Sequence, residues 1–183
     1  RLGTAATAKA RIGRRLGDAV EAGETLFIDT GSTTLAAAET LAAIPGLTII
    51  TNSCRLAERL VQSGSDAAIY LLGGRYGGDN AQTTGAAALE QLRGFRADRA
   101  VITVAAIDPA SGAMDASHDE AQVARAMIGN ARSLTVLADA TKFGRHAAFA
   151  VCTCAEIDLI ISDGQLDKGH KEALTNMGVE VWH

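Results

Sequence analysis

The sequence predicts an α/β protein in which a mostly parallel sheet is flanked by helices. Short apolar runs alternate with helical, often alanine-rich stretches along the whole chain. Of the 183 residues, 48% are hydrophobic but only 4% are aromatic, so Ala, Val, Leu and Ile must form most of the core. Such a core suits buried parallel strands covered by alanine-rich helices. The length fits one domain of ordinary size.

The elements follow in order, with turn signals between them. Gly23 ends the first helix, Pro45-Gly46 ends the second, and Gly73-Gly74 ends the third strand. We expect helices at residues 8–22, 33–43, 55–62, 86–92, 117–131 and 165–176. We expect strands at residues 25–29, 47–51, 67–72, 99–105, 134–138, 159–162 and 179–182, with a brief extended piece at 149–152. Residues 75–84 and the segment containing Pro109 and Gly112 are expected to be loops. Strands separated by helices favour parallel pairing through right-handed crossovers.

Residues 29–34, with the sequence Asp-Thr-Gly-Ser-Thr-Thr, join an apolar strand to a predicted helix. The first backbone N–H groups of a helix lack intrahelical partners and carry positive partial charge, so this turn is a natural seat for a phosphate or carboxylate. Ser32, Thr33 and Thr34 add hydroxyl donors. The alternative is that Ser32 or Thr33 merely caps the helix.

Small polar or glycine residues also follow other apolar runs. Thr51-Asn52-Ser53, Gly73-Gly74 and residues 139–144 each come directly after a predicted strand. Since the carboxyl ends of parallel strands share one edge of a sheet, these turns are expected to converge on one ligand. For the glycine pair, a flexible hairpin-like turn is the alternative.

Three charged side chains near these turns are candidates for ligand contacts. Asp119 and Glu120 open a predicted helix, and Ser117-x-x-Glu120 also matches a capping box, which gives Glu120 a purely structural alternative. Lys142 is placed to hold a phosphate as a point charge. Its alternative is a surface ion pair with Asp139.

Charge and cysteine content limit the function classes. The net charge is −4, yet residues 1–15 contain five basic residues and no acid, so the remainder has 12 basic against 21 acidic residues, or −9. An acidic body is a poor match for a phosphate backbone, so we do not expect this segment to bind nucleic acid unaided. The basic start fits either the remnant of a longer region or a solvated helix face. Three scattered cysteines support neither a disulfide framework nor a metal site.

Neither a bilayer-spanning run nor a signal peptide is evident, so we expect a cytoplasmic protein without membrane contact. The absence of an initiating Met suggests a fragment with a missing upstream domain. We find no recognised catalytic motif. A carboxylate and a lysine near a sugar phosphate are compatible with proton shuttling, so an isomerase remains the alternative to a binding protein.

A series of motifs in fixed order carries a family resemblance. They are Asp29-x-Gly-Ser-Thr-Thr34, Thr51-Asn52, Gly73-Gly74, Gly85, Asp98-x-Ala100, Glu120-Ala-x-Val123-x-Arg-Ala-Met127, Ala138-Asp139-x-Thr-Lys142-Phe-Gly144 and Ile157-Asp-Leu-Ile-Ile-Ser-Asp163. With these motifs, the chain resembles the C-terminal effector domain of the DeoR family of bacterial transcriptional repressors from about residue 12 to residue 182.

The resemblance implies an effector domain at residues 12–183 with a fold similar to ribose-5-phosphate isomerase, and a linker end or helix start at residues 1–11. It implies a sensor that binds a phosphorylated sugar or related metabolite without turnover and without a cofactor. A winged helix-turn-helix is absent from this chain, so operator DNA would be bound only through that missing domain. A homo-oligomer, dimer or tetramer, is also implied.

The resemblance also assigns ligand-binding residues by position. Gly31, Ser32, Thr33, Thr34 and Lys142 would hold the phosphate, while Asp29, Asn52 and Asp119 or Glu120 would meet sugar hydroxyls. The remaining residues of the expected site are Thr51, Gly73 and Gly74. One departure is that this chain has Thr103-Val-Ala-Ala-Ile-Asp108 where the family often has a glycine-rich stretch. The Cβ atoms of Val104 and Ala105 are expected to narrow the crevice.

Overall fold

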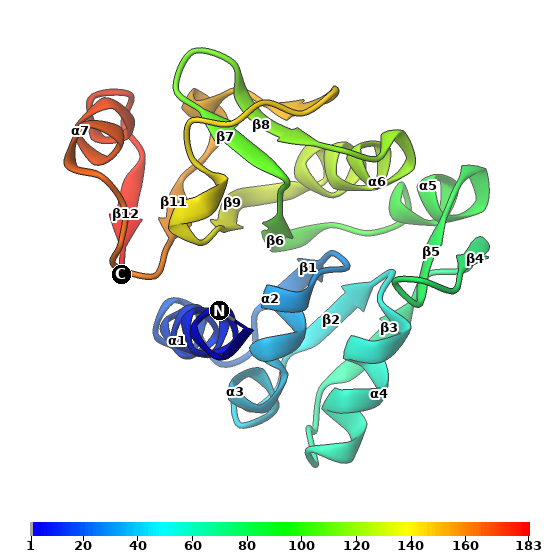
Figure 1. Ribbon diagram of the computed structural model, residues 1–183. Helices are drawn as coiled ribbons and strands as arrows, with labels where there is room; N and C mark the ends of the chain where they lie inside the picture. The colour runs from blue at the N-terminus through cyan, green and yellow to red at the C-terminus, as the bar shows by residue number, and fades with distance from the viewer. Residues whose placement is uncertain (1) are drawn as a thin grey trace.

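A computed structural model describes residues 2–183, with side chains from residue 5 onward, and contains a seven-stranded, fully parallel sheet (Figure 1). The strand order is β12-β11-β9-β6-β1-β2-β3. In chain order, the strands are β1 (Thr25–Ile28), β2 (Thr48–Thr51), β3 (Ala68–Leu71), β6 (Ala97–Thr103), β9 (Ala131–Leu137), β11 (Leu159–Ile161) and β12 (Glu180–Trp182). The predicted fold class, a mostly parallel sheet flanked by helices, is confirmed.

Strand β1 lies next to the central strand β6, and the direction of winding reverses between these two strands. Phe27 of β1 pairs with Ile50 of β2 on one side and with Ala100 of β6 on the other. The chain first adds β2 and β3 outward from β1, then returns to place β6, β9, β11 and β12 on the opposite side. The crevice at the carboxyl ends of β1 and β6 is therefore the topological switch point, where open α/β sheets bind ligands.

Helices and a small second sheet cover the two faces of the main sheet. In Figure 1, α1 (Leu2–Ala19), α2 (Ser32–Ala36), α3 (Ala38–Ala42) and α4 (Cys54–Gln62) lie below it. On the other face lie α5 (Ala86–Leu92), α6 (His118–Gly129), α7 (Lys168–Asn176) and the sheet β10-β8-β7. The alternation along β1 matches this layering, because Leu26 and Ile28 pack with the first group whereas Phe27 packs with the second.

Two segments expected as loops form hairpins instead. Strands β4 (Arg75–Gly77) and β5 (Gln82–Thr84) pair with each other, and β7 (Ala106–Asp108) pairs with β8 (Gly112–Asp115). Strand β10 (Phe149–Cys152), at the position of the brief extended piece, completes the second sheet against β8. The hairpin strands lack the continuous apolar run that marks equally short strands of the main sheet such as β1 and β11, so their sequences do not predict strands.

The helix expected at residues 33–43 is two five-residue helices, α2 and α3, joined at Ala37. The Ala37 N–H donates to the carbonyl oxygen of Thr34, three residues back, at 3.1 Å, so the turn is locally tightened. Because α2 is so short, its dipole alone is a weak basis for an anion site. By contrast, α1 already includes residues 2–11, which were expected as a linker end or helix start. Arg1 lies outside the described residues.

The described part of the chain contains no helix with the length and apolar character needed to cross a bilayer.

Candidate functional site

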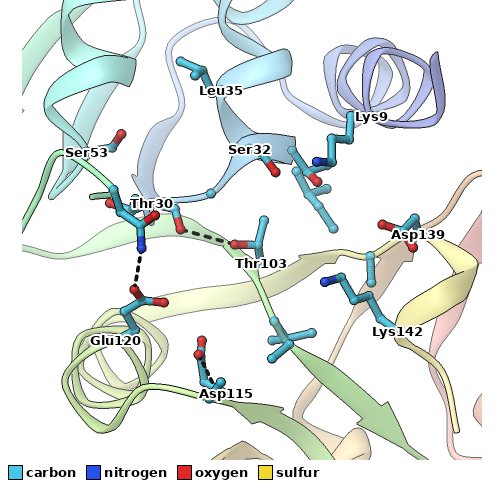
Figure 2. Close-up of a pocket in the computed structure, with 18 of the residues that line it drawn as sticks. Lys9, Thr30, Ser32, Leu35, Ser53, Thr103, Asp115, Glu120, Asp139 and Lys142 are labelled. Carbon is cyan, nitrogen blue, oxygen red and sulfur yellow. Dashed lines mark hydrogen bonds between the residues drawn. The ribbon is translucent and has the colours of Figure 1, made fainter. Parts of the chain in front are cut away.

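An open cavity of about 500 Å³ lies at the switch point, above the carboxyl ends of β1, β6 and β9. Its lining comes from α1, the turn after β1, the turn after β2 with Ser53 and Arg55, the β4–β5 hairpin, the end of β6, the start of α6 with the residues just before it, and the turn after β9. Among the lining residues are Lys9, Gly31, Ser32, Thr33, Thr103, Asp115, Glu120 and Lys142 (Figure 2). Four of these segments lie at or just after the ends of β1, β2, β6 and β9, which share one edge of the sheet, whereas α1, the hairpin and the start of α6 reach that edge from other parts of the fold.

The turn after β1 approaches β6 closely at Gly31. A Cβ atom on this residue would lie 2.3 Å from Oγ1 of Thr103, so only glycine lets the turn pass here. Ser32 and Thr33 follow on the cavity wall. Thr34 is fully buried, and its hydroxyl donates to the backbone oxygens of Asp29 and Gly31 at 3.1 and 2.9 Å. Thr34 therefore holds the shape of the turn rather than lining the cavity.

Asp29 lies behind this turn, buried, and fastens the end of β1 to β6. Its two carboxylate oxygens accept the backbone N–H of Thr103 at 3.1 and 3.0 Å. Burial raises the pKa of Asp29 well above its usual value, the hydrogen bond from Thr103 opposes that rise, and the negative charges of Asp115 and Glu120 add to it. Asp29 is thus a buried acid beside the cavity whose charged form is destabilised by burial, not a surface contact.

Two acids line the cavity from the α6 side. Asp115 ends β8 and accepts the backbone N–H groups of Ala116 and Ser117 at 2.6 and 3.2 Å. Glu120 accepts from the side-chain amides of Gln82 and Asn80 at 2.5 and 3.1 Å. These bonds fix both carboxylates where they meet the cavity, as Figure 2 shows. They form an acidic wall.

The expected capping box is only half present. Ser117 caps α6 by accepting the backbone N–H of Glu120 at 3.3 Å, but the Glu120 carboxylate bonds to Gln82 and Asn80 instead of turning back to the helix start. Asp119, the neighbouring candidate, does not line the cavity. It pairs with Arg75 at 2.9 Å and lies 3.6 Å from His118. Of the two acids that the resemblance offered, only Glu120 reaches the site.

Two lysines face the acidic wall. Lys142 ends the short helix η1 (Ala140–Lys142), and Lys9 reaches in from α1; both are half-buried. The alternative ion pair between Lys142 and Asp139 is not among the ion pairs of the described residues; Asp139 instead accepts the N–H of Thr141 at 2.9 Å. Among the described residues, neither lysine has an ion-pair partner. We call Lys9 and Lys142 the basic wall (Figure 2).

The other predicted site residues stand outside the cavity. Thr51 accepts the backbone N–H of Ser53 at 3.0 Å. Asn52 bridges two turns: its amide nitrogen donates to Thr83 at 3.0 Å, and its amide oxygen accepts from Thr30 at 3.3 Å. Both are fully buried and support the wall from behind.

The glycine pair does not join the other turns. Gly73 donates to the Gln91 side chain at 2.8 Å, and Gly74, with φ of +140°, packs where a Cβ atom would lie 2.5 Å from the carbonyl oxygen of Thr84. Three of the four turns therefore converge as expected. The place of the third is taken by Asn80, from the β4–β5 hairpin that the sequence did not predict.

Sequence reasoning missed Lys9, Asp115 and Thr103. For Lys9 a signal exists: it falls on the same helical stripe as Ile12 and Leu16, which are fully buried, so its stem had to face the body. For Asp115 the sequence contains no such signal, because its position depends on the β7–β8 hairpin. Val104 and Ala105 do line the cavity, at the departure from the glycine-rich family pattern.

The arrangement is suited to binding. Within the described residues no group of three or more His, Cys, Asp or Glu side chains is placed to hold a metal ion. Burial raises the pKa of the Cys152 thiol to about 12, which makes it a poor nucleophile. What the cavity does offer is a pair of unpartnered ammonium groups opposite two fixed carboxylates.

Comparisons with known proteins agree with this picture. A family model described as the DeoR C terminal sensor domain matches residues 4–164. The chain is 31% identical over 177 residues to the uncharacterized HTH-type transcriptional regulator YgbI of Escherichia coli (strain K12), covering 97% of this chain and 69% of that protein. It is 32% identical over 181 residues to the HTH-type transcriptional repressor GlcR of Bacillus subtilis (strain 168), covering 99% and 69%. A third relative, 29% identical over 94% of this chain and 68% of its own length, is the glycerol-3-phosphate regulon repressor of Escherichia coli (strain K12).

Solved structures share the fold at low identity. Ribose 5-phosphate isomerase from Plasmodium falciparum matches with a TM-score of 0.54 and 13% identity, over 81% of this chain and 54% of that one. The beta subunit of eIF2B from Chaetomium thermophilum matches with a TM-score of 0.56 and 14% identity, over 76% and 43%. The chain thus spans about half the length of these structures, and the likeness concerns the fold alone.

Proposed function

We propose that this chain, which belongs to the DeoR C-terminal sensor domain family, binds a phosphorylated sugar or related metabolite in its cavity. Ligand binding would then be signalled to a DNA-binding domain. The observation that carries the proposal is the basic wall. Two half-buried lysines without acid partners face one cavity, and a phosphate group would supply the missing counter-charge.

The acidic wall supports the sugar part of the proposal. Carboxylates accept hydrogen bonds from hydroxyl groups, and those of Asp115 and Glu120 are held in place by neighbouring donors. The same negative charges repel a phosphate from that side of the cavity. A ligand with phosphate at one end and hydroxyls at the other would therefore bind in one orientation only, with its phosphate against Lys9 and Lys142.

The relatives are named as transcriptional regulators and repressors, which supports a regulator rather than an enzyme. In the proposed protein, a helix-turn-helix domain outside this chain binds operator DNA, and the sensor domain self-associates as a dimer or tetramer, because paired half-sites need a symmetric reader. Control of sugar-metabolism genes is part of the same proposal. The ligand-binding set proposed here keeps Gly31, Ser32, Thr33, Glu120 and Lys142 on the cavity wall, with Asp29, Thr34, Thr51 and Asn52 supporting it.

A thermal-shift screen tests the binding proposal. Phosphorylated sugars and glycerol 3-phosphate would be compared with the same compounds lacking the phosphate. A ligand that binds only the native state, at a free concentration a hundred times its Kd, raises the free energy of unfolding by about 2.7 kcal/mol. We expect phosphorylated compounds alone to raise Tm clearly. Equal shifts for both sets, or a shift with neither, would overturn the proposal.

A further inference from the structure

Helix α1 is part of the cavity wall, although it is the element nearest the N-terminus of the chain. Its residues Ala5 and Lys9 line the cavity, one turn apart on the same face. The same stripe continues into Ile12 and Leu16, which are fully buried. The Lys9 stem therefore follows the packed face of the helix, and its ammonium group ends at the cavity, where Figure 2 places it near Ser32.

Helix α1 packs closely against α2, which follows the turn after β1 and begins at the cavity with Ser32. A Cβ atom on Gly13 would lie 2.9 Å from the carbonyl oxygen of Ala36, and one on Gly17 would lie 2.3 Å from Cγ2 of Thr40. Ala36 is the last residue of α2, and Ser32, at its start, lines the cavity. Gly13 thus lets α1 rest directly on α2, the helix that begins in the cavity, and Gly17 lets it rest on the following helix α3.

The second half of α1 is fastened to the far edge of the sheet. Arg11 donates to the backbone oxygen of Asp163 at 2.8 Å, and Arg15 donates to that of His183 at 3.0 Å. The Arg15 guanidinium also lies 4.9 Å from the ring centroid of Trp182. These contacts hold α1 from Arg11 onward, and none of them involves a residue that lines the cavity. Lys9 stands just before them, so a ligand contact at Lys9 would act on the first half of the helix.

We propose that Lys9 is a second cationic contact for the ligand phosphate and that a phosphate held between Lys9 and Lys142 fixes the first half of α1 to the β9 side of the cavity. The inference rests on the proposed function, because it requires a phosphorylated ligand. Both lysines line the same cavity and have no ion-pair partner among the described residues, so a phosphate dianion bound there would make two charge-assisted contacts. In the proposed regulator, α1 then connects ligand occupancy to the DNA-binding domain.

Calorimetry on single variants tests the contact. The probes are glycerol 3-phosphate, glucose 6-phosphate and inorganic phosphate, titrated into wild type, Lys9→Met, Lys9→Arg and the matched control Arg14→Met. Arg14 is an exposed cation on the same helix that does not line the cavity. We expect Lys9→Met to raise Kd about ten- to a hundredfold. Arg14→Met should stay within about twofold of wild type, and Lys9→Arg should recover most of the binding.

Hydrogen exchange tests the consequence for α1. A saturating probe should slow amide exchange at residues 5–12 in wild type, whereas in Lys9→Met the same occupancy should protect residues 31–35 but not the start of α1. A purely structural role for Lys9 would not separate these two regions. Thermal unfolding confirms that each variant is folded.

The outcomes separate this inference from the proposed function. If wild type binds none of the probes, the proposed function fails and the inference fails with it. If binding depends on Lys142 but Lys9→Met binds like wild type, or if saturating probe leaves the exchange of residues 5–12 unchanged, the function stands and the role of Lys9 is overturned.

Discussion

The acidic and basic walls of the cavity differ in how they are held. Asp115 and Glu120 are each fixed by two donors, from backbone or side-chain N–H groups. Lys9 and Lys142 have no ion-pair partner among the described residues. The acidic wall is therefore preorganised, whereas the basic wall carries positive charges that no acid of the described residues neutralises.

This difference suggests a division of labour within the proposed site. The fixed carboxylates of the acidic wall would select ligands by the positions of their hydroxyl groups. A hydroxyl in the wrong place would leave a carboxylate oxygen without a hydrogen-bond donor. Free ammonium groups on flexible stems supply affinity for a phosphate and can shift when it arrives. The predictions below test whether the two walls contribute separately, beginning with the largest expected effect.

Lys142→Met should weaken a phosphorylated ligand by about 1.5–3 kcal/mol, or roughly ten- to a hundredfold, because one charge-assisted contact is lost. The non-phosphorylated sugar should respond far less, since it does not use that contact. Calorimetry with both ligands measures the difference. Lys168→Met is the matched control, because Lys168 is an exposed lysine on α7 away from this cavity. Equal losses for both ligands would place the phosphate elsewhere.

Gly31→Ala should destabilise the fold by about 1–3 kcal/mol, because its Cβ atom would lie 2.3 Å from Oγ1 of Thr103 between the two walls. Denaturant unfolding measures the loss. Gly129→Ala is the control, since nothing lies within 4 Å of a Cβ atom there. Adding Thr103→Ala should restore part of the stability lost in Gly31→Ala. No recovery in that double variant would show that the clash is not with Thr103.

Each wall contains one residue that the sequence alone locates and one that it missed. Lys142, Ser32 and Glu120 follow strands or open a helix, so local patterns locate them, and the predicted range of α5 agrees residue for residue. Lys9 lay within reach of the same reasoning, because helical spacing puts it on the stripe of Ile12 and Leu16.

Asp115 and Asn80 were out of reach, for a physical reason. Each belongs to a hairpin whose strands lack the continuous apolar run that marks equally short strands of the main sheet such as β1 and β11. Likewise, Ala37 has no sequence feature that marks a break between α2 and α3. The break depends on packing against α1, where Gly13 meets Ala36. Tertiary contacts decide such details, and a single sequence does not contain them.

Asp29 gives the third prediction, a dependence of stability on pH. Its folded-state pKa is raised by burial above the unfolded value of about 3.9. The folded protein therefore keeps the proton at pH values where the unfolded chain has lost it. This contribution to stability is fully present below the unfolded-state pKa and is lost as pH rises through the folded-state pKa, with a slope of at most about 1.4 kcal/mol per pH unit.

Asp29→Asn should remove that slope, because an amide has no proton to lose and its oxygen still accepts the N–H of Thr103. Unfolding free energies measured across the acid range in wild type and variant give the comparison. Asp79→Asn, at an exposed position, should leave the slope as in wild type. If wild type and Asp29→Asn lose stability in parallel as pH rises, Asp29 does not hold a proton in the folded state.

Glu120→Gln should have the smallest effect on the affinity for a phosphorylated ligand, and it tests the acidic wall directly. The amide keeps one acceptor oxygen but removes a negative charge, so hydroxyl binding weakens by about 0.5–1.5 kcal/mol while repulsion of the phosphate falls. For the phosphorylated sugar, the weaker hydroxyl binding and the weaker phosphate repulsion change the affinity in opposite directions. For the sugar without a phosphate, only the weaker hydroxyl binding applies. The ratio of the two affinities should therefore rise in Glu120→Gln, whereas it should fall in Lys142→Met.

Calorimetry with the same pair of ligands measures both ratios. Glu90→Gln is the control, because Glu90 is an exposed glutamate on α5 that pairs with Arg93 at 2.9 Å and does not line the cavity. Opposite shifts in the two variants require a ligand held with its phosphate at one wall and its hydroxyls at the other. Shifts in the same direction would mean that both walls meet the same part of the ligand, and the division of labour between them would be wrong.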